Sequence, residues 1–428
     1  MKKIILLSGI LTMLITTPTF ADWQYQNNNW KYYDNQGYTV SDEWKKSGDN
    51  WYYLDYDENM ATDKLIYDDG DHYYVDQAGK MVSNQWQYLE DEYDDGEYHW
   101  FYFQGNGKAK QNGFLTIDGV KYHFTDGRMD EGWIQDNEDT YYTNPVHDGT
   151  YGSIKTGWVY IDDFDDDSVI DEEGWYYFGT NGKMVSGTEK KINGYYYVFN
   201  DDGLMLDGFV EFTKSTATSS NASDNETVYK FYRPENGDRI DGWYYVEDPD
   251  YYGLDGVDDD SWFYFKNGIM FSSEYNTIKI SDEVGVARIN GEYYGFDKNG
   301  QMITDFVYGY DNSIYYFDVD NGDMKTGKVR IDEDSDSDWA DEIFYFADSG
   351  KTGAKGQAIT GVKKGYLYDN GLLIKADSDV KYEVFIVDGQ DYLVNRSGKV
   401  MDSGTYKDGD DNYWVVQEID GIYNISKK

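Results

Sequence analysis

The chain has 428 residues, and its 82 Asp and Glu against 37 Lys and Arg give a formal net charge of −45. Such an acidic surface repels the phosphates of nucleic acids and anionic membranes, which excludes nucleic-acid binding from the expected functions. The chain has no cysteine, which excludes disulfide bonds and a thiol nucleophile. Aromatic residues make up 18% of it, more than acidic disordered segments contain, so we expect a folded protein.

The first 21 residues are typical of a secretory signal peptide. Lys2 and Lys3 form a positive n-region, the apolar residues 4–15 follow, and Ala21 is a small residue at the expected cleavage point. The apolar run is too short to span a bilayer, and the sequence turns polar at Asp22. We therefore expect an exported protein without a membrane span.

One phrase recurs along the rest of the chain. GWYYFGTNGKMVSG, residues 174–187, has relatives such as NWYYLDYDENM, HYYVDQAGKM, YYVFNDDGLM and YYGFDKNGQM. The turn glycine repeats about every 20 to 22 residues, a spacing typical of repeat proteins. A methionine stands two residues after this glycine at Met81, Met129, Met184, Met205, Met270, Met302 and Met324.

Each copy of the phrase predicts a β-hairpin, because aromatic residues favour strands and Asn-Gly or Asp-Gly pairs favour tight turns. One hairpin of this size cannot bury its apolar side alone, whereas stacked hairpins cover one another. The fold class predicted for residues 22–428 is therefore all-β, an elongated solenoid of about fifteen stacked β-hairpins without a separate globular catalytic domain.

The chain divides by composition into two repeat regions. Residues 22–324 are rich in tryptophan and carry acidic insertions, whereas residues 325–428 contain only Trp339 and Trp414 and are interpreted as degenerate or capping hairpins. Residues 211–227 are rich in Ser and Thr and predict an exposed insertion.

Phrases of the form TGW…GWYYFGTNGKMVSG and DGRMDEGW resemble the choline-binding, or cell-wall-binding, repeats of Gram-positive surface proteins. Related repeats occur in streptococcal glucan-binding domains and in the receptor-binding regions of clostridial toxins. In the choline-binding family, the tryptophan of GW, the tryptophan of WYY and a tyrosine of the next hairpin form an aromatic cage, often with a methionine nearby. The resemblance implies a secreted protein held non-covalently on the bacterial cell surface, with choline as its ligand and no cofactor.

Carried onto this chain, the resemblance implies five cages of two tryptophans and one tyrosine. They are Trp23, Trp30 and Tyr52; Trp44, Trp51 and Tyr73; Trp86, Trp100 and Tyr122; Trp158, Trp175 and Tyr196, with Met184; and Trp243, Trp262 and Tyr293. Trp133 has Tyr141 in place of a second tryptophan. Aromatic faces attract a quaternary ammonium, which offers no strong hydrogen bond. The alternative is plain packing of the seams between hairpins. Leu, Val and Ile would serve packing as well, so the tryptophans as a set favour cages.

Three tryptophan pairs are separated by acidic insertions, which begin after Trp86, Trp158 and Trp243, and a further acidic run spans residues 332–342. Three interpretations stay open for these segments. They are solvated loops, they attract cations toward the cages, or their carboxylates bind calcium, a hard cation that prefers oxygen ligands.

We expect a binding protein that docks on choline-bearing teichoic acid or a similar wall polymer, as an adhesin or a spacer. One alternative is carbohydrate binding to a glucan or host glycan through the same rings, and another is a structural rod that contacts a host protein through its acidic loops. No enzyme and no metal site is expected. The histidines, interpreted as structural, are His72, His99, His123 and His147.

Overall fold

The computed structural model describes residues 21–91, 96–162, 170, 172–213, 227–257, 259–331, 339–350 and 354–428. The expected signal peptide lies outside these residues except for Ala21. So do most of the Ser/Thr-rich segment 211–227 and the central parts of the acidic segments after Trp86 and Trp158 and near Trp339.

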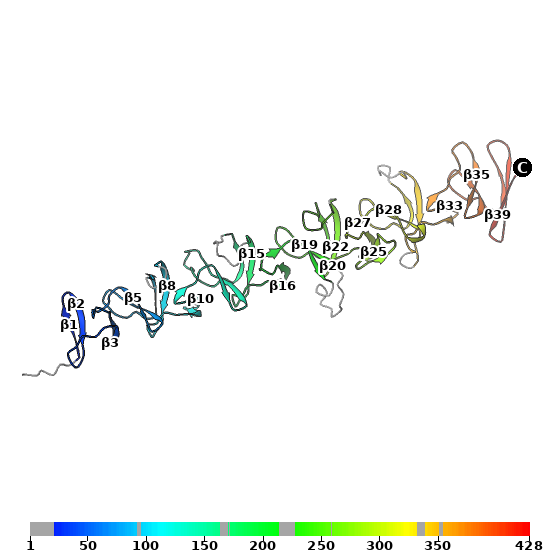
Figure 1. Cartoon of the computed structure of the whole chain (residues 1–428). Coiled ribbons are helices and arrows are strands. Elements are labelled where there is room, and N and C mark those ends of the chain that lie inside the picture. The colour runs from blue at the N-terminus through cyan, green and yellow to red at the C-terminus, as the bar shows by residue number, and fades with distance from the viewer. Residues whose placement is uncertain are drawn as a thin grey trace, which may run out of the picture. The chain divides into compact units, whose positions relative to one another are not determined.

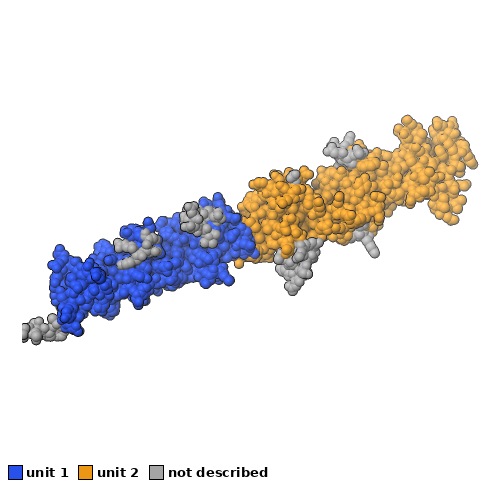
Figure 2. Space-filling model, in the orientation of Figure 1, with its two compact units in different colours: residues 1–187, 199–204 blue, residues 188–198, 205–428 orange. Residues whose placement is uncertain are grey.

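The regular secondary structure of the described chain is almost entirely β-strand, and successive strands pair antiparallel as hairpins (Figure 1). This confirms the predicted all-β fold class. Two compact units are present, residues 1–187 with 199–204 and residues 188–198 with 205–428 (Figure 2). The division expected at residue 325 does not coincide with the boundary of these units and stays a prediction. No helix in the described part of the chain is long and apolar enough to cross a membrane.

The strands of the first unit are β1 (Asp22–Gln26), β2 (Asn29–Tyr33), β3 (Glu43–Ser47), β4 (Asn50–Leu54), β5 (Lys64–Asp68), β6 (Asp71–Val75), β7 (Gln85–Glu90), β8 (Tyr98–Phe103), β9 (Gly113–Ile117), β10 (Val120–Thr125), β11 (Arg128–Met129), β12 (Trp133–Asp136), β13 (Asp139–Tyr142), β14 (Gly157–Ile161) and β15 (Gly174–Phe178).

The remaining elements are β16 (Thr188–Ile192), β17 (Tyr195–Phe199), β18 (Met205–Leu206), β19 (Gly208–Thr213), β20 (Thr227–Tyr232), β21 (Gly242–Val246), β22 (Ser261–Lys266), β23 (Ile269–Met270), β24 (Ile278–Lys279), β25 (Gly285–Ile289), β26 (Glu292–Phe296), β27 (Met302–Ile303), β28 (Asp305–Tyr308), the 3-10 turn η1 (Tyr310–Asn312), β29 (Ile314–Phe317), β30 (Gly327–Arg330), β31 (Ile343–Phe346), β32 (Gly361–Lys363), β33 (Tyr366–Asp369), β34 (Leu372–Leu373), β35 (Tyr382–Val387), β36 (Gln390–Asn395), β37 (Gly404–Lys407), β38 (Tyr413–Ile419) and β39 (Ile422–Lys427).

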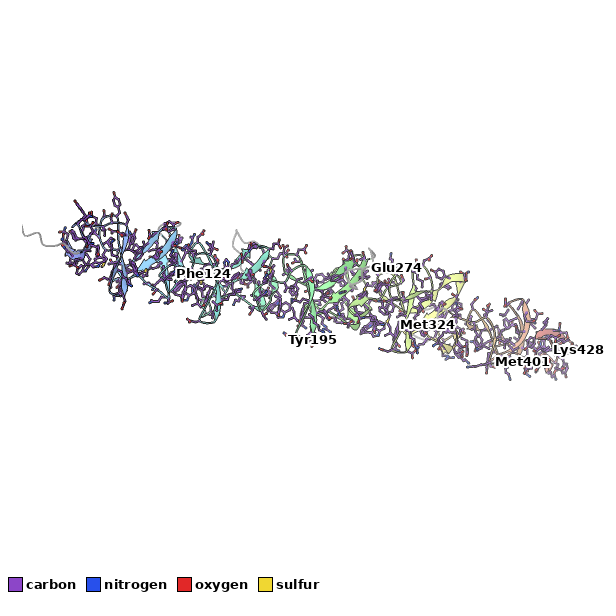
Figure 3. The ribbon with its side chains drawn as sticks, turned by 90° about the horizontal axis from the view of Figure 1, so that it is seen from below. Phe124, Tyr195, Glu274, Met324, Met401 and Lys428 are labelled. Carbon is purple, nitrogen blue, oxygen red and sulfur yellow. The ribbon has the colours of Figure 1, made fainter. Side chains whose placement is uncertain are left out.

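The apolar end of each second strand forms the core of its hairpin. These side chains have almost no exposed surface at Leu54, Val75, Phe103, Phe124, Phe178, Phe199, Phe296, Phe317 and Phe346. Figure 3 labels one of them, Phe124 of β10. Alternate strand residues point to opposite faces of the hairpin. The buried residue at the end of the strand therefore determines which residues of the repeated sequence face the neighbouring hairpin.

Successive hairpins are joined by a methionine that packs on the turn glycine of the next hairpin. A Cβ added to these glycines would collide with the methionine side chain. The pairs are Met60 with Gly79, Met81 with Gly107, Met129 with Gly152, Met184 with Gly203, Met205 with Gly237, Met270 with Gly300, Met302 with Gly322 and Met324 with Gly356. The regular spacing of methionine and glycine in the sequence therefore reflects a contact that sets the hairpin-to-hairpin distance.

A backbone hydrogen bond accompanies this contact. The N–H of Met60 donates to the carbonyl of Trp30 at 2.8 Å, and the N–H of Met81 donates to the carbonyl of Trp51 at 2.9 Å. Each methionine thus ties its own hairpin to the second strand of the preceding one. The two contacts together fix the register between neighbours.

The methionine contact is tested by paired glycine substitutions. Gly70 and Gly79 both have positive φ, +84° and +76°, but a Cβ on Gly70 meets open space while one on Gly79 would lie 2.8 Å from Cε of Met60. Both alanine variants are expected to lose about 1–2 kcal/mol of stability, because alanine disfavours the left-handed backbone conformation. Gly79→Ala is expected to lose about 1–3 kcal/mol more through overpacking.

The measurement is native-state hydrogen exchange over β3 to β6, since local opening energies are defined even where a repeat chain does not unfold in one step. Equal losses in Gly70→Ala and Gly79→Ala would show that the methionine contact does not fix the hairpins.

Candidate functional site

Four side chains enclose a space between the first hairpin and the next. After hairpin β1–β2 these are Trp23, Trp30, Tyr52 of the next hairpin, and Met60. With Ser47 and Ala78 they line a cavity of about 300 Å³. We name the four the first tryptophan, second tryptophan, tyrosine and methionine positions, and the space the inter-hairpin site.

Strand pairing explains why two tryptophans distant in sequence lie together. Trp23 is opposite Tyr32, and Tyr25 is opposite Trp30, so all four project from one face of the hairpin. The same registers place both members of every predicted pair on one face, for Trp44 and Trp51, Trp86 and Trp100, Trp158 and Trp175, and Trp243 and Trp262.

The tyrosine of the following hairpin closes three of the five sites as predicted. The rings of Trp23 and Tyr52 have centroids 5.4 Å apart, those of Trp44 and Tyr73 are 5.1 Å apart, and those of Trp86 and Tyr122 are 4.9 Å apart. The ring planes of these pairs are inclined by 67°, 54° and 67°, so none of them is stacked face to face, an arrangement that aromatic pairs favour.

The structure corrects the predicted tyrosine at the Trp243 site. Tyr294, not Tyr293, contacts Trp243, with centroids 4.8 Å apart. Tyr293 is the second residue of β26, as Trp51 is of β4, and so occupies a second tryptophan position. Because adjacent strand residues point to opposite faces, a shift of one residue moves the ring to the other side.

Tyr196 points away from the face of β17 whose residue Phe199 contacts Trp158. Trp158 and Trp175 lie in the first unit, whereas Tyr196 lies in the second. The ring centroids of Trp158 and Phe199 are 5.7 Å apart. Tyr196 lies three residues before Phe199 on β17, so its side chain points to the opposite face of the strand. The run of three tyrosines at residues 195–197 conceals this register in the sequence.

Met184 belongs to the Trp133 site rather than to the Trp158 site. Its N–H donates to the carbonyl of Thr140 at 2.8 Å, which makes Thr140 the residue at the second tryptophan position. Tyr141, the residue expected there, instead contacts Phe114 on the other face, with centroids 4.8 Å apart. The Trp133 site therefore lacks a second aromatic wall from its own hairpin.

Most second tryptophans are exposed to solvent. Their exposed fractions are 43% for Trp30, 40% for Trp51, 45% for Trp175 and 44% for Trp262. Each of three is held by a tyrosine opposite it, with centroids 5.4 Å apart in the pairs Tyr25–Trp30, Tyr160–Trp175 and Tyr245–Trp262. The sequence signal for this support is a tyrosine two residues after the first tryptophan, which the predicted cages do not include.

The Trp86 site encloses a cavity of about 410 Å³ and has a wall that the repeat does not supply. Its lining residues are Trp86, Trp100, Tyr122, Met129, His147, Gly149 and Tyr151. His147 stacks on Tyr151, with ring centroids 3.8 Å apart and planes 16° from parallel. Sequence reasoning treated His147 as structural, and the longer turn between Thr143 and Ile154 was the available signal.

This wall stands on a structured turn. The buried Asn144 donates from Nδ2 to the carbonyl of Val146 and to side-chain oxygens of Asp148 and Thr150. Burial and a hydrogen bond with Glu131 raise the pKa of Tyr151, and burial raises the pKa of Tyr122. Both phenols are therefore neutral near physiological pH.

The acidic insertion after Trp243 packs on the preceding hairpin. Leu254 and Val257 are buried beside Phe209, whose N–H donates to the carbonyl of Tyr252 at 2.6 Å. This insertion is therefore a folded loop with its own apolar anchor. In the described ranges, no three His, Cys, Asp or Glu side chains gather closely enough to hold a metal ion.

Charged side chains replace the aromatic ones after hairpin β16–β17. Glu189, the second residue of β16, accepts hydrogen bonds from Lys230 at 2.9 Å, Tyr232 at 2.8 Å and Arg239 at 2.9 Å. Burial alone would raise the pKa of Glu189, but the hydrogen bonds from Lys230 and Tyr232 outweigh it and hold this pKa below its ordinary value. The N–H of Arg239 donates to the carbonyl of Tyr196, so Arg239 holds the methionine position.

The Glu189 cluster predicts an acid-sensitive contribution to stability. Because its folded pKa lies below the ordinary value of 4.5, this contribution is complete above pH 4.5 and is lost as pH falls through the folded pKa. Glu189→Gln is expected to cost about 3 kcal/mol near neutral pH, since it leaves Lys230 and Arg239 without their carboxylate.

Calorimetric unfolding from about pH 7 to about pH 3 measures this contribution, and the gap between wild type and Glu189→Gln is expected to shrink on acidification. Glu211→Gln, at an exposed carboxyl of β19, is the matched control. A gap that is the same at both ends of the pH range contradicts the assignment.

Comparison with known proteins connects this geometry to one repeat family. Residues 284–328 match the choline-binding repeat. This segment includes hairpin β25–β26 and β27, which supply Tyr294 and Met302 around Trp243. The match confirms the resemblance to choline-binding repeats that the sequence indicates.

Two curated relatives are streptococcal enzymes. Glucosyltransferase-I of Streptococcus downei is 27% identical over 327 residues, 62% of this chain and 18% of that protein. Glucosyltransferase-S of Streptococcus mutans is 28% identical over 345 residues, 80% of this chain and 19% of that protein. The chain therefore spans less than a fifth of the length of these relatives.

Similar solved structures come from Streptococcus pneumoniae. The choline-binding domain of CbpL is 28% identical, with 44% of this chain and 87% of that chain covered and a TM-score of 0.31. Choline binding protein F is 18% identical, with 84% and 100% covered and a TM-score of 0.29.

Proposed function

We propose that this protein binds quaternary ammonium groups of a cell-wall polymer, such as choline-bearing teichoic acid, through its inter-hairpin sites. The proposal rests chiefly on the Trp86 site, where two tryptophans, a neutral tyrosine and a methionine surround a cavity of about 410 Å³. Such a volume is typical of small-ligand pockets.

The chemistry of the walls favours a cation without hydrogen-bond donors. Each ring face attracts a positive charge by about 0.5–2 kcal/mol, depending on how far the cation is desolvated. Three rings, less the cost of association, correspond to a dissociation constant near the millimolar range, about −4 kcal/mol. One site alone would hold a polymer weakly.

Repetition turns weak sites into firm attachment. The aromatic sites at Trp23, Trp44 and Trp86 lie in one compact unit, and the site at Trp243 lies in the other. A polymer with many choline groups can engage several sites, and each later contact forms at high effective concentration. We propose that the protein acts in this way as a non-enzymatic adhesin or spacer on the cell surface.

The test is retention on a resin that carries trimethylammonium groups. Because the chain has a net charge of −45, any such resin also retains it by simple ion exchange. Loading and washing in about 1 M NaCl shortens the Debye length to about 3 Å and removes that contribution. Retention that survives the wash and ends on addition of free choline is the expected result.

Trp86→Ala combined with Trp100→Ala is expected to elute at a lower choline concentration than wild type, because one site is lost from the array. Tyr56→Ala, which removes an aromatic side chain that is 83% exposed, is the control and is expected to elute as wild type does. Complete elution of the wild type by NaCl alone overturns the proposal.

Carbohydrate binding is the second candidate, and one groove in the second unit favours it. Trp339, 41% exposed, and Phe306 line a space of about 260 Å³ with Asp369 and Asn370. Within the described chain neither Asp369 nor the side chain of Asn370 is engaged by another side chain. The exposed face of Trp339 can stack on a sugar ring, while Asp369 and Asn370 can hydrogen-bond to its hydroxyl groups. Retention on immobilised dextran that Trp339→Ala abolishes, without retention on the trimethylammonium resin, would support this candidate instead.

A further inference from the structure

The same inter-hairpin position contains a lysine of the chain itself after hairpin β9–β10. Phe114 is the second residue of β9 and Lys121 the second of β10, as Trp44 and Trp51 are in β3 and β4. The N–H of Ile154 donates to the carbonyl of Lys121 at 2.9 Å, the same bond that Met60 makes to Trp30. Phe114, Lys121, Tyr141 and Ile154 therefore occupy the four positions that line an aromatic site elsewhere.

The ammonium group of Lys121 lies against two aromatic rings of this site. Its Nζ is 3.8 Å from the ring centroid of Phe114 and 5.3 Å from that of Tyr141. The ring centroids of Phe114 and Tyr141 are 4.8 Å apart. This is close to the distance between the first tryptophan and the tyrosine at other sites, such as 4.9 Å for Trp86 and Tyr122. The Nζ also donates to the carbonyl of Asn181 at 3.1 Å, so the chain supplies both the walls and their cation.

Arg239 fills a second site from the methionine position. Its guanidinium carbon lies 4.2 Å from the ring centroid of Tyr196, which holds a second tryptophan position. Nη1 donates to Glu189 at 2.9 Å, and only 8% of the Arg239 side chain is exposed. A cation held over an aromatic ring thus recurs in two inter-hairpin sites, from the second tryptophan position at Lys121 and from the methionine position at Arg239.

We infer that Lys121 and Arg239 are built-in occupants of two cation sites, and that withdrawing Lys121 opens a further site for a methylated ammonium ligand. The inference rests on the proposed function. A tethered side chain is present at a far higher effective concentration than a free ligand, so a weak external cation does not displace it. Substitutions at these two residues therefore change the number of open sites.

Equilibrium dialysis of the full chain with labelled tetramethylammonium counts the sites. Lys121→Ala keeps both rings and is expected to bind one equivalent more than wild type, whereas Lys121→Arg keeps a cation and is expected to bind the wild-type number. Lys80→Ala, at an exposed turn lysine, is the matched control for the change of net charge. A crystal of Lys121→Ala with the ligand would show it against the rings of Phe114 and Tyr141, in the space that the Lys121 ammonium group occupies in the wild type.

Wild-type stoichiometry in a folded Lys121→Ala variant overturns the inference. Lys191 also holds its Nζ 5.2 Å from the ring centroid of Tyr196, so the second test, used if Lys121→Ala does not fold, combines Arg239→Met with Lys191→Ala. One added equivalent near Tyr196 is the expected result, and no added equivalent contradicts the inference. Failure of the proposed function is a separate outcome, namely a wild-type chain that binds no tetramethylammonium. A new site that appears only in Lys121→Ala would still support the inference in that case.

Discussion

The contact between a methionine and the turn glycine of the next hairpin is the constraint on which the rest of the structure depends. It brings the backbone N–H of the methionine to the carbonyl of the second tryptophan position, as in Met60 and Trp30. Once this spacing is set, a tyrosine of the next hairpin falls against the first tryptophan. The inter-hairpin site is therefore a consequence of how the hairpins stack, and it arises wherever they do so.

Side-chain identity at the four positions then decides what the site holds. Two tryptophans, a tyrosine and a methionine leave a neutral aromatic cavity at Trp86. Lysine within aromatic walls gives the internal cation at Lys121, and a carboxylate with arginine gives the ion cluster at Glu189. The lysine and the arginine both lie over rings, which is the behaviour expected where quadrupoles attract positive charge. One backbone arrangement thus provides open and filled cation sites.

Sequence reasoning predicted the hairpins, because glycine turns, methionines and strand-forming aromatics repeat together. It also paired the tryptophans correctly, since each pair belongs to one hairpin. Tyr293 is one residue from the tyrosine that contacts Trp243, and Tyr196 lies on the wrong face of its strand. A run of tyrosines gives no sign of which one faces the neighbour, because only the buried end of the strand fixes that register. The wall formed by His147 and Tyr151 was not predictable from the repeat, since it comes from an insertion held by Asn144.

The central claim is that the aromatic sites recognise positive charge on a methylated group and not its shape. Tryptophan fluorescence titrations with choline, and with its neutral analogue in which carbon replaces the quaternary nitrogen, test this most directly. The account predicts saturable quenching by choline in about 1 M NaCl and a far weaker response to the analogue, because only choline gains the cation–π attraction. Equal responses to both ligands, or a response only to a glucan oligosaccharide, would contradict it.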